Sequence, residues 1–263
     1  MAAQKAKILL STDTLSWYGL DLIFQIAKDT GYDGIDLALW KNFDSRNVEY
    51  VYKLQEKYDL PVKCIQLSDR TNPKEMNIAL EMARKCGCDT ISINSPSIFN
   101  IKSYSFLANN LWGYRNQNAK IKFSIINPPK QNLFILPIPK FRFSNIVDII
   151  KKYHCYLAFD MVNVDDQMLE SEFMRKIPNF IPYLSVIYLS DKSKTGQSHL
   201  PLGDGELKLP NILKKLKQFE YQNNFSVKLE LSKRELSDQG KVELILKKCK
   251  TYYNEYYKDV VIE

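Results

Sequence analysis

Three residues of this chain have the types and surroundings needed for acid–base chemistry. Asp160 and Glu230 each lie inside a short apolar segment, LAFDM and VKLEL, and His199, one of the chain's two histidines, lies in the polar segment HLPLGDGE. A carboxylate at the end of a buried strand is costly unless it is paired, hydrogen-bonded or bound to a cation. A neighbouring lysine or a loop backbone could satisfy either acid. The two acids together with His199 favour a shared site, and we predict that all three are catalytic.

Further polar residues close other apolar runs along the chain, and Asp36 in GIDLAL is one of them. Amide and carboxylate groups at such positions can hydrogen-bond a polar ligand. The residues that we predict to bind substrate are Gln66, Asn94, Asn127, Asn163 and Asp191.

Apolar runs alternate with segments of helical periodicity along the whole chain. The expected strands cover 7–11, 34–39, 60–67, 89–95, 122–127, 156–161, 186–189 and 227–232. The expected helices cover 17–30, 48–58, 72–85, 104–119, 144–153, part of 167–176, 210–221 and 242–253. Gly31 is placed to end the first helix, and Pro73 to open the third.

Eight strands alternating with helices at spacings of roughly 30 residues predict an α/β fold, a single (β/α)8 TIM barrel that forms one domain over 1–263. A doubly wound open sheet is the alternative. It is disfavoured because the first strand-to-helix turn lacks a G-x-G-x-x-G sequence, and the chain has no phosphate-binding P-loop sequence. In a barrel the carboxyl ends of the strands meet at one face, so the polar residues above would form one site.

The segment 128–143 interrupts the alternation with Pro128, Pro129, Pro137 and Pro139. These prolines exclude a continuous helix, so we expect a loop over one end of the molecule that could carry a short hairpin. Its apolar part, 133–138, is either a subunit contact in a homo-oligomer or a lid over the site.

The net charge of +7 would suit phosphorylated ligands or nucleic acid. The lysines are spread over the expected helices, however, and no binding motif accompanies them, so nucleic acid is not the predicted partner. The five cysteines lack metal-site spacing and are expected to be buried or free thiols. No apolar run is long enough to cross a bilayer, and no secretory signal is recognisable, so we expect a cytoplasmic protein without a membrane partner.

Several segments together resemble the xylose isomerase-like TIM-barrel superfamily, which contains sugar and sugar-phosphate isomerases and epimerases and the AP endonuclease IV relatives. The similarity covers nearly the whole chain, and HLPLGDGEL is its most specific match. The other matching segments are GYDGIDL at 31–37, CYLAFDMVN, VIYLSDKSK and VKLEL.

This resemblance implies that Asp160 and Glu230 stand at metal-binding carboxylate positions and that His199 contacts substrate or metal. One divalent metal ion (Mg, Mn, Co or Zn) is therefore the implied cofactor. Amide oxygens ligate a hard cation such as Mg²⁺ but carry no charge.

Several positions depart from the family pattern. Ile126 stands where a glutamate is expected, and Asn163 and Tyr188 stand where histidines are expected. Gln66 and Asn94 replace histidines of the endonuclease branch, which argues against a three-zinc site. Tyrosine, with a pKa near 10, is a poor base at neutral pH.

The sequence thus favours an enzyme, a divergent sugar or sugar-phosphate isomerase or epimerase that transfers a proton at a carbonyl/hydroxyl centre, with or without a divalent metal. The alternative is a catalytically degenerate barrel that binds a sugar-like ligand without turnover. A small polyhydroxyl molecule is the expected ligand in both cases.

Overall fold

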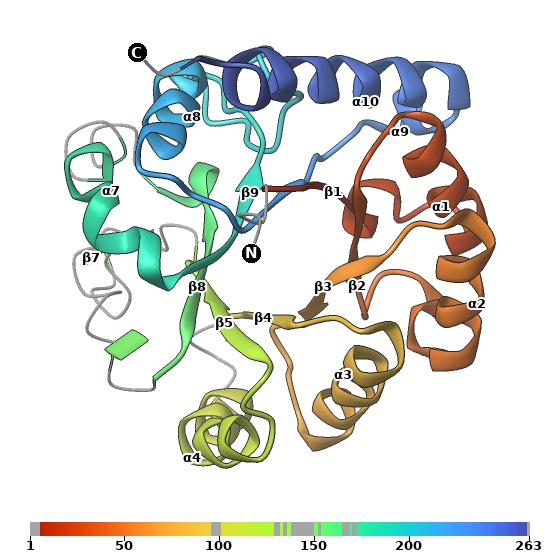
Figure 1. The fold of residues 1–263 in the computed structure, drawn as a ribbon, viewed down its shortest axis with the longest axis vertical. Coiled ribbons are helices and arrows are strands. Elements are labelled where there is room, and N and C mark those ends of the chain that lie inside the picture. The colour runs from red at the N-terminus through yellow and green to blue at the C-terminus, as the bar shows by residue number, and fades with distance from the viewer. Residues whose placement is uncertain are drawn as a thin grey trace.

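The computed structural model describes residues 6–95, 101–128, 132–133, 136–137, 150–151, 154–164, 169 and 173–261. Within them, eight parallel strands close into a barrel in the order β1-β10-β9-β8-β5-β4-β3-β2 (Figure 1). The strands are β1 (Ile8–Ser11), β2 (Gly34–Ala38), β3 (Val62–Leu67), β4 (Thr90–Asn94), β5 (Lys122–Ile126), β8 (Tyr156–Asp160), β9 (Leu184–Leu189) and β10 (Asn224–Val227). The predicted (β/α)8 barrel is confirmed.

The helices lie outside the ring of strands (Figure 1). They are α1 (Leu20–Asp29), α2 (Val48–Tyr58), α3 (Pro73–Cys86), α4 (Ile101–Gln117), α7 (Met174–Phe180), α8 (Leu209–Gln218), α9 (Lys233–Leu236) and α10 (Gln239–Tyr253). Local sequence sets several of their ends. Asn72 caps α3 by accepting a hydrogen bond from the Glu75 N–H, Pro73 opens that helix, and Gly31 follows α1 with a φ of 78°.

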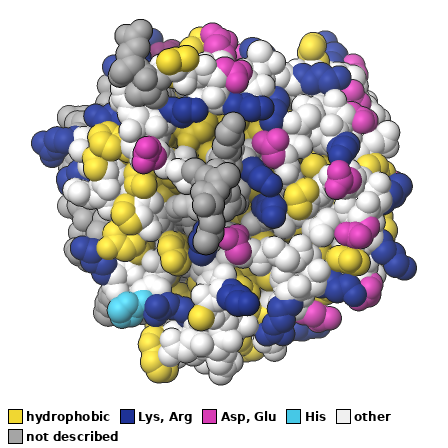
Figure 2. Space-filling model, viewed as in Figure 1, with side chains coloured by type: hydrophobic (Ala, Val, Ile, Leu, Met, Phe, Trp, Pro, Cys, Tyr) yellow, Lys and Arg dark blue, Asp and Glu magenta, His cyan; other side chains and the backbone are white. Residues whose placement is uncertain are grey.

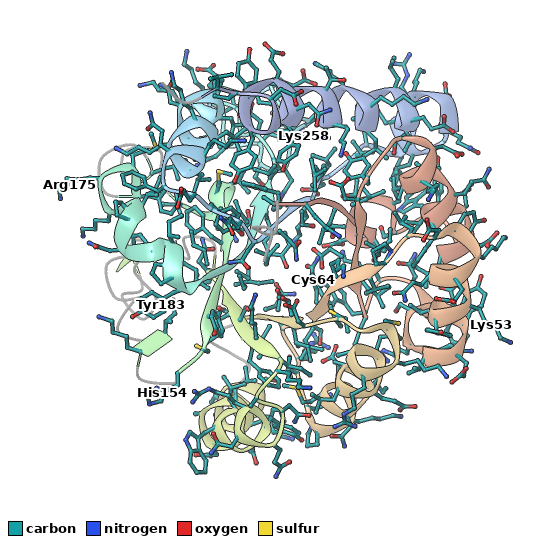
Figure 3. All side chains as sticks on the ribbon, in the orientation of Figure 1. Lys53, Cys64, His154, Arg175, Tyr183 and Lys258 are labelled. Atoms are coloured by element: carbon teal, nitrogen blue, oxygen red, sulfur yellow. The ribbon has the colours of Figure 1, made fainter. Side chains whose placement is uncertain are left out.

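The interior of the barrel is separate from the core between strands and helices. Alternate residues along each strand point inward, and the apolar members of this inner set are Leu9, Cys64, Ile126, Ala158, Val186 and Tyr188. Figure 3 shows Cys64 within the ring of strands, whereas Lys53 and Arg175 point outward from the surrounding elements. Many other inward positions are polar and buried, among them Ser11, Asp36 and Ser226. The interior of the barrel is therefore partly polar.

The bounds predicted for the last strand are wrong. The strand was expected over 227–232, but β10 is Asn224–Val227, which pairs with β1 and β9. Beyond Val227 only the Lys228 N–H continues the ladder, to the Leu189 carbonyl. The Leu229 N–H then bonds the hydroxyl of Thr14, so the chain leaves the sheet before Glu230. The alternating apolar residues of VKLEL have the periodicity of a strand, which is why the prediction was placed there. The observed strand has the less apolar sequence NFSV.

The other expected elements fall close to their predicted places where they are described. The 128–143 loop does contain a short antiparallel pair, β6 (Asn132–Leu133) with β7 (Leu136–Pro137). The helix predicted over 144–153 lies outside the described residues except at 150–151. The side chains of 133–138 are also outside the described part, so the choice between a lid and a subunit contact stays a prediction. The helix sought within 167–176 is described as α7, which begins at Met174 and ends later.

Two composition-based expectations can be compared with the structure. All five cysteines are buried and free, as expected. Lys and Arg side chains are spread among Asp and Glu over the face shown in Figure 2. None of the described helices is long and apolar enough to cross a membrane.

Candidate functional site

The carboxyl ends of β2, β1, β10 and β8 bring two lysines and two aspartates into a row, with Lys41 in the turn that follows β2. Asp13 lies in the short helical turn η1 (Thr12–Leu15) that follows β1, Asp160 ends β8, and Lys228 directly follows β10. The Lys41 ammonium lies 3.1 Å from Asp13, and the Lys228 ammonium lies 3.9 Å from both Asp13 and Asp160. We call Lys41, Asp13, Lys228 and Asp160 the charge chain. Its charges alternate in sign across the mouth of the barrel.

Asp160 has a fixed backbone and an unsatisfied carboxylate. The side-chain amide of Asn127 holds the Asp160 backbone on both sides, accepting from its N–H at 2.7 Å and donating to its carbonyl at 2.9 Å. The residue is only 1% exposed, yet neither carboxylate oxygen has a hydrogen-bond partner in the part of the chain that the structure describes. Buried polar groups without partners are rare and call for an explanation. A carboxylate held this rigidly and left unsatisfied is suited to receive a ligand.

His199 faces the same carboxylate. Its Nε2 lies 3.9 Å from Asp160 Oδ2, and its side chain is 19% exposed. On the other edge of the ring, Nδ1 lies 3.3 Å from the carbonyl oxygen of Lys228. Ser190 Oγ also lies 3.2 Å from Nδ1 and can donate or accept. A neutral ring that donates from Nδ1 to the Lys228 carbonyl presents a lone pair at Nε2, whereas a ring that accepts at Nδ1 from Ser190 presents an N–H toward the Asp160 carboxylate. His199 has a φ of 57°, a left-handed conformation that is uncommon for a residue with a Cβ.

Lys228 is the central cation of the mouth. Its side chain is 14% exposed, and its ammonium lies 5.1 Å from the centre of the Tyr188 ring. Among the described residues the ammonium has ion-pair neighbours but no hydrogen-bond acceptor. Its three N–H donors therefore remain available for a ligand oxygen.

Tyr188 cannot serve as a base here. It is fully buried, and its hydroxyl has no hydrogen-bond partner among the described residues. Burial raises the pKa of Tyr188 well above its usual range, so the phenol stays protonated. The ring instead forms an aromatic floor under the Lys228 ammonium.

Asp36 lies in a hydrogen-bonded cluster within the barrel. Gln66 Nε2 and Ser226 Oγ each donate to its Oδ2 at 2.7 Å, and Gln66 also donates to Ser11 Oγ at 2.9 Å. Burial raises the pKa of Asp36 to about 6, against the opposing effects of these hydrogen bonds and of the Lys228 charge. The structure thus places Gln66, predicted to bind substrate, beside Asp36.

Asp191 holds a loop together. Its carboxylate accepts hydrogen bonds from the backbone N–H groups of Lys192, Gly203 and Leu207, at 2.8, 3.1 and 3.0 Å. Its own backbone forms a bridge with Leu200. These bonds fold the segment HLPLGDGEL back over the end of β9 and place His199 at the mouth.

Three other predicted residues can be located. Asn94 Nδ2 donates to the Leu67 carbonyl and Asn163 Nδ2 to the Asn127 carbonyl, at 2.8 and 2.9 Å, so both link adjacent strand ends. Glu230 is exposed, and its N–H bonds the His199 carbonyl at 2.9 Å. No described contact brings its carboxylate to Asp160 or His199.

The mouth does not fit a divalent metal ion. Among the described residues no group of three or more His, Cys, Asp or Glu side chains could hold one. The Asp160 oxygen that would ligate a cation beside His199 already faces the Lys228 ammonium at 3.9 Å. Metal sites in proteins collect anionic or lone-pair donors, and an ammonium offers neither.

A cavity of about 580 Å³ lies near the amino ends of β5 and β8, lined by residues that include Arg115, Lys122, His154 and Tyr183. Figure 3 shows His154 and Tyr183 on this side of the ring. In barrels of this class, chemistry takes place at the carboxyl ends of the strands, so we do not assign the reaction to this cavity.

Comparison with solved structures identifies the fold. The chain matches a xylose isomerase domain protein from Alicyclobacillus acidocaldarius with a TM-score of 0.71 and 13% identity, covering 94% of this chain and 97% of that one. It matches an L-ribulose 3-epimerase with a TM-score of 0.68 and 12% identity, over 97% and 95% of the two chains. The IolI protein, whose structure contains a zinc atom, matches with a TM-score of 0.69 and 13% identity, over 95% and 99%. The chain therefore has the fold of the xylose isomerase-like barrels, as its segments suggested.

Sequence comparison adds little about function. No protein-family model matches the chain. Uncharacterized proteins of Mycobacterium tuberculosis and Mycobacterium leprae are 28% and 27% identical to it over 99 residues. The match spans 34% of this chain and about a third, 35%, of the length of these relatives.

Sequence reasoning overlooked Asp13 and Lys228. Asp13 follows the first apolar run in STDTL, two residues after the end of β1. Lys228 has the same strand parity as Glu230, so alternation alone does not tell the two side chains apart. Only the position of the strand end shows that Lys228, rather than Glu230, reaches the mouth.

Proposed function

We propose that this protein is an isomerase or epimerase of a small polyhydroxylated carbonyl compound, a sugar or sugar phosphate. The observation that carries the proposal is the pairing of His199 Nε2 with the buried, unsatisfied carboxylate of Asp160 at the barrel mouth, 3.9 Å apart. Such a pair can take up and return a proton, which is the chemistry that both reactions share.

His199 is the proposed base. In the tautomer that donates from Nδ1 to the Lys228 carbonyl, the Nε2 lone pair can take a proton from the carbon beside a substrate carbonyl. The electron pair of that C–H bond moves onto the carbonyl oxygen, giving an enediolate. Return of the proton to the other face of the same carbon yields an epimer. Return to the neighbouring carbon yields an isomer, and the hydroxyl proton then moves from one oxygen to the other so that the carbonyl re-forms at the first carbon.

Asp160 supports this transfer electrostatically. When His199 gains a proton, the imidazolium faces a carboxylate that Asn127 holds in place through its backbone. An opposite charge at this distance stabilises the protonated ring. A direct catalytic role for Glu230 stays a prediction, because its exposed side chain would have to turn toward the mouth.

A second candidate function is ligand binding without turnover. It is favoured by the placement of Glu230, since the two-carboxylate site that the resemblance implies is not assembled. The unsatisfied Asp160 and Lys228 groups would still bind hydroxyl or carbonyl oxygens.

The test is a panel of aldoses, ketoses and their phosphates incubated with the purified protein, with products read by NMR. Isomerase or epimerase activity is expected to convert at least one compound and to be lost in His199→Gln. The matched control is Asp59→Asn, an exposed residue whose φ of 46° suits asparagine. A compound that raises the melting temperature while no panel member is converted would favour the binding protein instead.

A further inference from the structure

The position of Lys228 suggests which group supplies the positive charge at this site. Its ammonium is placed by three parts of the barrel: Asp160 at the end of β8, Asp13 after β1, and the face of Tyr188 in β9. The side chain is 14% exposed, so the charge is largely removed from water. The placement is that of a built-in charge rather than of a solvated surface lysine.

The positive and negative charges of the charge chain already cancel. Two ammonium groups, of Lys41 and Lys228, face the two carboxylates of Asp13 and Asp160. A divalent ion bound to Asp160 would lie beside the Lys228 ammonium and be repelled by it in a partly buried setting, where screening by water is weak. His199 alone would remain as a second ligand, which is too few for a stable site.

We infer that the Lys228 ammonium is the cation of this site in place of a divalent metal ion, and that the barrel mouth works without a bound metal. The absence of a metal does not depend on the proposed function. The role given to the Lys228 ammonium does, because that role is to bind the substrate carbonyl oxygen and the enediolate formed from it. The three N–H donors of Lys228 have no hydrogen-bond acceptor among the described residues, so they can bind that oxygen.

Metal binding without substrate tests the inference independently of any activity. The chelator-treated full chain is titrated with Mn²⁺ and with Zn²⁺, and bound metal is measured by paramagnetic resonance and by elemental analysis. The wild type is expected to show no saturable site at the mouth up to about 1 mM free Mn²⁺. Saturable binding of one equivalent that Asp160→Asn removes would overturn the inference.

A variant that reverses the charge at Lys228 should create the metal site that the wild type lacks. Lys228→Glu places a second carboxylate beside Asp160 and His199, which completes three ligands of the kind that hold Zn²⁺ or Mn²⁺. This variant is expected to gain about one equivalent of Zn²⁺ and a metal-dependent rise in melting temperature. Lys241→Glu, an exposed lysine on α10, is the control and should gain neither. Circular dichroism confirms folding, and the wild-type titration decides the question if Lys228→Glu does not fold.

Once a substrate is found, activity distinguishes the role of Lys228 from the proposed function itself. Wild-type turnover is expected to survive dialysis against EDTA, to fall at least about tenfold in Lys228→Met, and to recover in part in Lys228→Arg, which keeps the positive charge. Turnover that EDTA abolishes and Mn²⁺ restores would leave the isomerase proposal standing and overturn this inference.

Discussion

Two aspartates at adjacent strand ends, Asp160 at the end of β8 and Asp191 after β9, are both almost fully buried, but their carboxylates differ in hydrogen bonding. Asp191 accepts hydrogen bonds from three backbone N–H groups of its own loop. The Asp160 carboxylate accepts no hydrogen bond from any described residue, and it faces Lys228 and His199 at 3.9 Å. The first aspartate builds structure, and the second keeps its bonding capacity for a ligand. Hydrogen-bond satisfaction separates the two roles where burial and sequence do not.

The largest effect on stability is expected from Lys228→Met. This change leaves the buried carboxylate of Asp160 without its cation, and breaking such pairs costs about 3–5 kcal/mol. Because the two groups are 3.9 Å apart, we expect a loss of about 3 kcal/mol, measured by urea unfolding. Lys228→Met combined with Asp160→Asn should recover most of it. A single variant as stable as Lys241→Met would show that Asp160 does not depend on Lys228.

Asp36 is a third buried carboxylate, with hydrogen bonds but no close ion pair among the described residues. Its ionisation makes the stability of the protein depend on pH. Its pKa rises from an ordinary 3.8 to about 6 on folding, which corresponds to about 3 kcal/mol. The unfolded chain releases this proton at lower pH than the folded one. Stability from this group is therefore lost as pH rises from about 4 to about 6, and the full cost applies above that range.

The check is urea unfolding of wild type and Asp36→Asn at several values between pH 4 and pH 8. The variant, which has no such ionisation, should gain up to about 3 kcal/mol on the wild type across this range. The exposed control Asp59→Asn should run parallel to the wild type. A constant difference between wild type and Asp36→Asn would contradict the raised pKa of Asp36.

Asp191→Asn tests the structural member of the pair. The amide nitrogen would replace a carboxylate oxygen that accepts from a backbone N–H, so at least one bond is lost and two donors face each other. We expect a loss of about 2 kcal/mol and faster hydrogen exchange at the amides of Gly203 and Leu207. Unchanged protection of these amides would mean that the loop holds without Asp191.

A smaller loss is expected from Gly205→Ala. A Cβ at Gly205 would collide with the Asp191 carboxyl group and the Lys192 backbone, whereas a Cβ at Gly113 in α4 meets nothing nearby. Thermal unfolding should show a loss of about 1–2 kcal/mol for Gly205→Ala and none for Gly113→Ala. Equal stability of the two variants would show that the loop can move away from Asp191.

Most of the fold follows from the sequence because apolar periodicity is strong in it. The strand at 34–38 and the helix at 48–58 were predicted almost to the residue, since apolar runs and helical faces there are uninterrupted. The last strand was misplaced because Leu229 and Leu231, which are buried beyond the end of the sheet, extend the alternating pattern past Val227.

The site was less predictable for a related reason. Sequence shows that Asn127 and Asp191 follow strands, but not that the Asn127 amide is bonded to the Asp160 backbone or that the Asp191 carboxylate is bonded to a loop. It shows a lysine two residues before Glu230, but not which of the two side chains reaches the mouth. These outcomes depend on register and on where a strand ends, which the residue types alone leave open.

The most direct test of the account is solvent deuterium incorporation at the carbon beside the carbonyl of a bound sugar, followed by NMR in wild type, Asp160→Asn and Asp191→Asn. Rates are compared per folded molecule, at a temperature where all three are folded. The account predicts incorporation by wild type, a fall of about 10²–10⁴-fold in Asp160→Asn, and a much smaller fall in Asp191→Asn. Incorporation by Asp160→Asn at the wild-type rate would contradict the assignment of Asp160 to the reaction.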